Sequence, residues 1–399
     1  MKPSSRWNFL APVLLNNRYP ALHGFRVIIF LMVIIYHFNQ RFSPFFNGVW
    51  FLLDSLFVLT GFLISLILLH AIDRKGSGIW RFYLRRSLRI FPAYYFVLIG
   101  YVLIFGLGEV SVAEFWREMF YLTNYAMDQP RLMSWSWSLC MDEHFYLLCP
   151  FVIIMLKNLP SHKSRLLALV AIWFSALPLR IWILSTFGEV DMERQFYAQI
   201  FYPTHTRYDE LFSGIIAGYL LFYFQPELQK AFNRPGVKLW QIPPLVACAV
   251  VLYLFRYVSP VSNPMIFKLG AAGFATAASI FFAVIILALV STNNFVVRSM
   301  GHRWFLFVAS ITYPVYLVHQ YVFGKFSRDF VGWLDTIVGG DTSVLSRFIA
   351  FIVLTGLATA IGYVIHIVVE KPLLIWRDNS DVRQLALSGK KESANRPPN

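Results

Sequence analysis

Three basic side chains, His23, Arg26 and His37, lie in a segment of the sequence that is otherwise almost wholly hydrophobic. Residues 21–38 read ALHGFRVIIFLMVIIYHF, long and hydrophobic enough to cross a membrane, yet they include Arg26 and His37. Ionisable groups there cost about 2.5–3.5 kcal/mol each to insert, so they usually face a bundle interior or a polar cavity. A helix places both residues on one face, about 16 Å apart along its axis. The pattern predicts a polar track through the membrane; the simpler alternative is an interfacial arginine and a hydrogen-bonded core histidine.

Other polar groups border or interrupt later apolar segments. Such residues are Asp142, Glu143 and His144, then His205, Arg207, Asp209 and Glu210, then Tyr313, Tyr316, His319 and Gln320. Taken singly, a carboxylate before a helix is often a dipole partner, and a tyrosine near a membrane interface is often an anchor. All three groups, and His37, fall on the same side of the predicted topology, which indicates a shared site.

The composition is that of a polytopic membrane protein. Hydrophobic residues make up 57% of the 399 residues and charged residues only 14%, while the 18% of aromatic residues suits interfacial belts. The three cysteines have neither a metal-ligand spacing nor the pattern of a disulfide framework. The fold class expected is all-α, with about ten transmembrane helices. The expected spans are 21–38, 48–70, 90–106, 145–157, 165–187, 211–225, 242–258, 265–290, 304–324 and 346–369.

Basic residues predict the orientation of these spans. Alternate loops and tails carry 23 lysines and arginines on one side and nine on the other, so both termini are predicted to be cytoplasmic. The net charge of +14 is then a signal of topology and requires no nucleic-acid partner. We expect a cytoplasmic tail over 1–19, a membrane domain over 20–377 and a polar, disordered cytoplasmic tail over 378–399.

Several short motifs follow one another along most of the chain. They are Arg26 and His37 with ten residues between them, Asp54 before LFVLTGF, RRSLRIFP with Arg86, Arg89 and Pro92, WSLCMDEHFY with Ser138 and Asp142, Arg207-x-Asp209, SITYPVYLVH, and Glu370-x-Pro372. In this order they resemble the acyltransferase-3 family of integral membrane O-acyltransferases, which acetylate cell-surface glycans. The resemblance covers about residues 20–372. Asp142 stands where the family has glutamate, with Glu143 beside it.

The resemblance implies transfer of an acyl group, most simply acetyl, from cytoplasmic acetyl-CoA to a carbohydrate hydroxyl at the outer face of a cell's inner (plasma) membrane. Acetyl-CoA would be a co-substrate, with no other cofactor and no metal. Planar guanidinium groups bind phosphates well, so the expected acyl-CoA-binding residues are Arg26, Arg85, Arg86 and Arg89. The expected acceptor-binding residues are Ser138, Arg207, Asp209, Tyr313 and His319.

The chemistry of such a transfer needs a base near neutral pH and a clamp for the donor. Histidine has the ordinary pKa that suits the base, which makes His37 the candidate, with Asp142 or Glu143 as its orienting carboxylate. No serine or cysteine lies in a nucleophile elbow, which leaves direct transfer or a transient acyl-histidine. The alternative function is a transporter of anions or lipid-linked sugars. A transporter should show an internal repeat, and the sequence has none that we recognise.

Overall fold

The described part of the chain is helical apart from short turns and connections, and it contains no strand. The computed structural model describes residues 19–39, 51–72, 78–105, 111–126, 132–188, 190–233, 246, 263–338 and 344–377. Within these ranges eight helices are long and apolar enough to span a membrane, and a pair bent by 100° supplies a ninth. The all-α, polytopic fold class is therefore confirmed. The expected span at 242–258 lies outside the described residues, apart from residue 246.

The long helices follow the expected order with different ends. They are α2 (Ala21–Asn39), α3 (Asp54–Ile72), α4 (Gly78–Phe105), α6 (Trp137–Lys157), α7 (His162–Ser185), α12 (Pro264–Ser291), α14 (Arg303–Val338) and α15 (Val344–Ile365). The bent pair is α9 (Tyr208–Tyr223) and α10 (Gln225–Asn233). Short elements between them are α5 (Val112–Met119), η3 (Thr123–Tyr125), α8 (Met192–Phe196), η4 (Tyr197–Phe201), η5 (Thr204–Thr206), α13 (Phe295–Met300) and η6 (His366–Glu370), of which η4 and η6 are π-helical.

Two helices begin well before the apolar stretch that predicted them. The span expected at 90–106 begins at Gly78, so the arginines of RFYLRRSLR lie on α4 itself and not in a connecting loop. The span expected at 145–157 begins at Trp137, which brings Asp142 and Glu143 onto α6. In both helices the polar residues face other helices and a cavity, which relieves the cost of exposing them to lipid. Hydropathy alone cannot detect such one-sided polarity.

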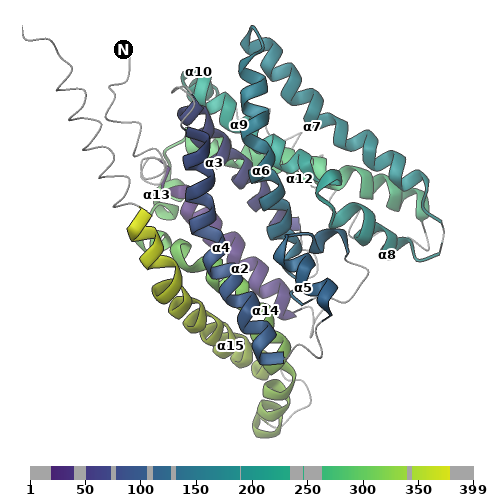
Figure 1. The fold of residues 1–399 in the computed structure, drawn as a ribbon, viewed down its shortest axis with the longest axis vertical. Coiled ribbons are helices and arrows are strands. Elements are labelled where there is room, and N and C mark those ends of the chain that lie inside the picture. Colours follow the sequence, from purple (N-terminus) through teal and green to yellow (C-terminus); the bar gives the residue numbers. More distant parts are fainter. Residues whose placement is uncertain are drawn as a thin grey trace, which may run out of the picture.

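Figure 1 shows how the bundle is arranged. Helices α14 and α15 run side by side at the lower left, α7, α8 and α12 lie to the right, and α2, α3 and α6 lie between these groups. The middle of the bundle therefore has helix neighbours on both sides, as a buried polar site requires.

Helices α3 and α9 touch along small residues. A Cβ atom added to Gly61 would lie 2.0 Å from the Leu211 carbonyl oxygen, and one added to Gly214 would lie 2.1 Å from the Val58 carbonyl oxygen. Gly214 and Gly218 form a small-xxx-small pair, which allows close approach of helix backbones in membranes. This contact holds Asp54, at the start of α3, beside the start of α9.

The segment before α6 is fixed by a buried glutamate. Glu118 of α5 accepts hydrogen bonds from the Tyr94 hydroxyl at 2.9 Å and from the Met133 amide at 3.1 Å. Burial raises the pKa of Glu118 above its ordinary value. These contacts tie residues 132–136, and so Trp135, to helix α4.

Candidate active site

A cavity of about 540 Å³ runs through one half of the bundle. Helices α2, α3, α4, α6 and α14 line it, together with η6 and the residues that follow it. The lining stops part-way along three helices, at Phe30 of α2, Ile90 of α4 and Tyr316 of α14, and on α6 it begins at Ser138, the second residue of the helix. We call the part lined by Arg81, Arg85 and Arg377 the arginine end, and the opposite side of the bundle, which carries His37, the histidine end.

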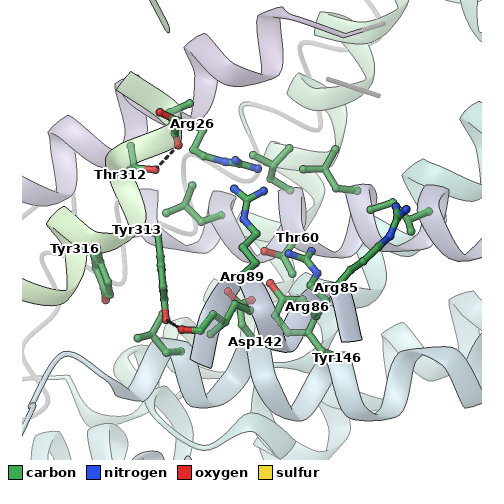
Figure 2. Close-up of a pocket in the computed structure, with 18 of the residues that line it drawn as sticks. Arg26, Thr60, Arg85, Arg86, Arg89, Asp142, Tyr146, Thr312, Tyr313 and Tyr316 are labelled. Carbon is green, nitrogen blue, oxygen red and sulfur yellow. Dashed lines mark hydrogen bonds between the residues drawn. The ribbon is translucent and has the colours of Figure 1, made fainter. Parts of the chain in front are cut away.

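Arginine side chains dominate the arginine end. Figure 2 shows Arg26 of α2 and Arg86 and Arg89 of α4 reaching into the same space. The Arg86 guanidinium lies 4.4 Å from the centre of the Tyr146 ring, so its flat face is held by α6. Arg81, Arg85 and Arg89 lie four residues apart on one face of α4, and Arg86, next to Arg85, also lines the cavity. A cavity with this many guanidinium groups is suited to a ligand with several phosphates.

Carboxylates line the same cavity. The Asp142 Oδ1 and Glu143 Oε1 atoms are buried without a hydrogen-bond partner among the described residues. Glu370 joins them from the π-helix η6, where it accepts a 2.7 Å hydrogen bond from His366. The π-turn places these two lining residues four positions apart on one face. Asp142 and Glu143 therefore lie in the same cavity as the arginines.

The predicted base has a histidine for a neighbour. His37 Nδ1 lies 2.8 Å from His319 Nε2, and His319 Nδ1 lies 2.6 Å from the Tyr316 carbonyl oxygen. Because a carbonyl can only accept, His319 Nδ1 donates, His319 Nε2 accepts and His37 Nδ1 donates. A neutral His37 then carries its basic lone pair on Nε2. The structure thus pairs His37 with His319, the residue expected to bind the acceptor, and not with the expected Asp142 or Glu143.

The histidine pair lies just beyond the end of the cavity. His37 follows Phe30 by about 10 Å of helix rise, and His319 follows Tyr316 by about 4.5 Å. Ser138 and Tyr316 stand at this limit with their hydroxyl oxygens 2.7 Å apart. Tyr313, one turn nearer the arginine end, donates a 3.1 Å hydrogen bond to the Ile90 carbonyl. Ser138 and Tyr313, expected to bind the acceptor, therefore line the arginine-rich cavity.

Arg207 and Asp209 lie in a separate ionic network. Arg207 contacts Asp54 and Glu210, with all three side chains fully buried. The guanidinium also lies 4.6 Å from the Phe201 ring centre and 5.1 Å from that of Phe274. Neither Arg207 nor Asp209 lines the cavity. This geometry favours a structural role for both over the expected acceptor binding.

Arg180 of α7 is a member of this network that sequence reasoning missed. It is fully buried and bonds both carboxylate oxygens of Asp209, at 3.0 and 2.7 Å. It also donates to the carbonyls of Ala272 and Thr206 and to Thr276. A lone arginine inside the apolar run of residues 165–187 was the available signal, since such a charge needs a buried partner.

Comparison with known proteins now identifies the family. A family model described as an acyltransferase domain, that of acyltransferase-3, matches residues 19–367. The chain belongs to the acyltransferase-3 family. The resemblance seen in the motifs is thereby confirmed, and the expected class, an O-acyltransferase, agrees with the names of similar proteins.

Two of these relatives come from Bacillus subtilis and Staphylococcus aureus. The chain is 26% identical over 326 residues to "Putative peptidoglycan O-acetyltransferase YrhL" of Bacillus subtilis (strain 168). The alignment covers 76% of this chain and 48% of that protein. It is 27% identical over 321 residues to "O-acetyltransferase OatA" of Staphylococcus aureus (strain NCTC 8325 / PS 47), covering 75% of this chain and 50% of that protein. The chain thus spans about half the length of the curated relatives it matches. No solved structure matches it.

Proposed function

We propose that this protein transfers an acetyl group from cytoplasmic acetyl-CoA to a hydroxyl of a carbohydrate at the outer face of the membrane. The observation that carries the proposal is an arginine-lined cavity that ends one helical turn from His319, which is hydrogen-bonded to His37. The names of the relatives, O-acetyltransferases, support acetyl as the acyl group and a cell-wall glycan as the acceptor class.

The arginine end would hold the donor. Acetyl-CoA carries several phosphate charges at one end and a thioester on a long, narrow arm at the other. Arg85, Arg86 and Arg89 suit the phosphates, since each guanidinium can make paired, charge-assisted hydrogen bonds. The arm would then extend past Arg26 and Asp142 towards Ser138 and Tyr316, where the cavity narrows to its end.

The histidine end would activate the acceptor. With Nδ1 donating to His319, the Nε2 lone pair of His37 can take the proton of the attacking hydroxyl. His319 would fix the tautomer and orientation of His37, the part played by a carboxylate in serine hydrolases. The geometry suits direct attack by the acceptor hydroxyl on the thioester.

The excess of basic residues near the arginine end supports a cytoplasmic location for the donor and an inner (plasma) membrane topology. Cysteine labelling tests this arrangement at two exposed positions. Val112→Cys should react with an impermeant thiol reagent in intact cells, and Lys163→Cys only after permeabilisation. The reverse result would put the arginine end outside and remove acetyl-CoA as donor.

The proposed base is tested by His37→Gln, which keeps a hydrogen-bonding side chain but cannot take a proton at neutral pH. Loss of a general base typically costs about 10²–10⁴ in rate. We expect a fall of this size in acetyl mass on cell-wall glycans, measured by mass spectrometry at matched protein abundance. The control is His302→Gln, which makes the same change at an exposed histidine outside the cavity. Full activity in His37→Gln would exclude His37 as the base.

A further inference from the structure

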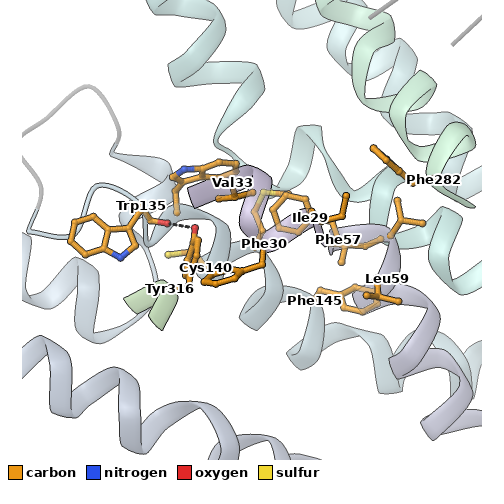
Figure 3. Close-up of a cluster of buried hydrophobic side chains, with 14 of the residues drawn as sticks. Ile29, Phe30, Val33, Phe57, Leu59, Trp135, Cys140, Phe145, Phe282 and Tyr316 are labelled. Atoms are coloured by element: carbon orange, nitrogen blue, oxygen red, sulfur yellow. Dashed lines mark hydrogen bonds between the residues drawn. The ribbon is translucent and has the colours of Figure 1, made fainter. Parts of the chain in front are cut away.

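A pair of hydroxyl groups closes the cavity on the side of the histidine pair. Ser138 Oγ and Tyr316 Oη lie 2.7 Å apart, and both residues line the cavity. Their side chains are nearly enclosed, with 5% and 8% of the residue surface exposed. Figure 3 shows Tyr316 and Trp135 joined by a hydrogen bond among apolar side chains, including Phe30 and Cys140. Two hydroxyls in an apolar, enclosed position interact strongly with any charge that develops there.

The hydrogen bonds of this pair allow two arrangements of its two protons. In one, Ser138 donates to Tyr316 and Tyr316 donates to the Trp135 carbonyl; in the other, Tyr316 donates to Ser138. Tyr316 Oη lies 3.1 Å from the Trp135 carbonyl oxygen, whereas Ser138 Oγ lies 3.4 Å from the same oxygen, at the limit of a hydrogen bond. When Tyr316 donates to Ser138, the serine hydroxyl keeps only this long contact. A carbonyl oxygen at the end of the cavity would be a better acceptor for the serine proton.

We propose that Ser138 donates a hydrogen bond to the thioester carbonyl oxygen of the donor and stabilises the oxyanion formed during transfer, with Tyr316 as a positioning residue behind it. The proposal rests on the proposed function. In that arrangement Tyr316 donates to Ser138 and Ser138 donates to the oxyanion, so the two hydrogen bonds strengthen each other. Ser138 is thereby assigned to the donor, not to the acceptor.

The transfer step balances with these groups. The acceptor hydroxyl oxygen bonds to the acetyl carbon while His37 Nε2 takes the hydroxyl proton, and the carbonyl oxygen gains the charge that Ser138 stabilises. The C–S bond then breaks, the carbonyl re-forms, and the proton from His37 neutralises the departing CoA thiolate. The products are the acetyl ester and CoA.

The backbone of α14 connects this hydroxyl pair to the base. The Tyr316 carbonyl accepts the hydrogen bond from His319 that sets the histidine tautomers, and the ring centres of Tyr316 and His319 lie 5.2 Å apart. Ser138 is thereby connected to the base through Tyr316 and His319. A thioester carbonyl bound at the end of the cavity would meet an oxyanion donor that is linked to the base through one turn of α14, so attack and charge stabilisation can act together.

The test uses membrane vesicles of expressing cells, acetyl-CoA labelled in the acetyl group, and the acceptor that the vesicles contain. We expect Ser138→Ala to lower the maximal rate by about 10²–10³, the usual effect of losing one oxyanion donor, with the apparent KM for acetyl-CoA changed by less than about threefold. Ser138→Thr, which keeps the hydroxyl, should recover much of the rate. Ser213→Ala is the control, since Ser213 is equally enclosed, at 6% exposure, and bonds only the Glu210 carbonyl outside the cavity.

Tyr316→Phe tests the positioning role by a double-mutant cycle. Alone it should lower the rate roughly five- to tenfold, as for one lost hydrogen bond, and in the Ser138→Ala background it should have no further effect. A purely structural role for Tyr316 would instead give additive losses in the double variant, and this would overturn the positioning role.

Other results contradict the proposal for Ser138. A Ser138→Ala rate within threefold of wild type would overturn it, as would a raised KM with an unchanged maximal rate. Recovery of a peptide acetylated on Ser138 would make the serine a nucleophile. Wild-type vesicles that bind CoA but transfer no label beyond empty-vector vesicles would overturn the proposed function itself, and with it this role.

Discussion

Two groups of arginines inside the helix bundle have opposite surroundings. Arg180 and Arg207 are buried where α3, α7, α9 and α12 meet, each has a carboxylate at hydrogen-bond distance, and neither lines the cavity. Arg26, Arg86 and Arg89 lie where α2, α4, α6 and α14 meet and face about 540 Å³ of space. In the first group protein atoms occupy the positions around the guanidinium; in the second a ligand can occupy them.

The groups that surround a charge distinguish a structural charge from a ligand-facing charge in a membrane protein. A charge that is held for stability has its hydrogen bonds completed by the protein, because an incomplete buried ion pair is costly. A charge that binds a ligand keeps donors directed into space. Residue type and depth in the membrane do not separate the two cases, but the hydrogen-bond partners of the charged side chain do.

The largest expected effect is on folding, from the first group. Arg207→Leu leaves Asp54 and Glu210 buried without their cation, and breaking a buried pair in this way costs about 3–5 kcal/mol. We expect little folded protein, measured as the monodisperse fraction after detergent extraction. Adding Asp54→Asn and Glu210→Gln should restore part of that fraction. A folded, inactive Arg207→Leu protein would instead return Arg207 to acceptor binding.

The second prediction makes the corresponding change in the cavity. Arg86→Ala combined with Arg89→Ala should fold normally but bind CoA at least about tenfold more weakly, because each hydrogen bond to a charged group contributes about 1.5–3 kcal/mol. Titration calorimetry of the purified protein with CoA measures this directly. Arg298→Ala, at an exposed arginine outside the cavity, is the control. Unchanged CoA affinity in the double variant would leave these arginines as a topology signal alone.

The third prediction compares Asp142, a carboxylate of the cavity, with Asp54, the carboxylate that contacts Arg207. Asp142→Asn should fold normally, whereas Asp54→Asn should lower the folded fraction, since only Asp54 has an arginine at hydrogen-bond distance. Removing the Asp142 charge from the cavity should also tighten CoA binding roughly two- to fivefold at low salt. Calorimetry and the extraction assay measure both effects. Loss of acetyl transfer with unchanged CoA binding would support Asp142 as the orienting carboxylate of the base.

The smallest effect concerns Glu118, a buried carboxylate hydrogen-bonded by Tyr94 and Met133. Burial raises its pKa in the folded protein above the ordinary value of 4.5. Its contribution to stability is thus complete below about pH 4.5 and is lost as pH rises through the folded-state value. The melting temperature of Glu118→Gln relative to wild type should therefore increase from pH 5 to pH 8. A difference that stays constant with pH would contradict the raised pKa.

The sequence was sufficient for the class of fold and for the arginines that line the cavity. Long apolar runs predict membrane helices whatever their neighbours, so nine of the ten expected spans have counterparts among the described helices. The arginines of the RRSLRIFP motif could be expected near a phosphate ligand, because like charges packed together in a helix bundle need opposite charges nearby. Both inferences depend on local composition.

Pairing between distant segments could not be predicted in the same way. His37 and His319 are 282 residues apart, and Arg207 and Asp54 are 153 apart, so only the packing of helices decides that they meet. Arg207 and Asp209 carry the same signal in sequence as a binding site, an arginine and a carboxylate near a membrane surface. Arg180, which completes the bonds of Asp209, lies on another helix and changes the interpretation.

The Arg180–Asp209 contact also bears on how the chain enters the membrane during synthesis. Helix α7 carries Arg180 five residues before its end, and inserting the helix alone costs up to about 2.5–3.5 kcal/mol for that residue. The carboxylate that neutralises it is in α9, only 29 residues later. If α7 stays at the translocon until α9 has been synthesised, this cost is avoided. The two helices can then enter the lipid together, with the charges of Arg180 and Asp209 neutralised. The bundle is thus expected to assemble part of its interior before its helices are fully released.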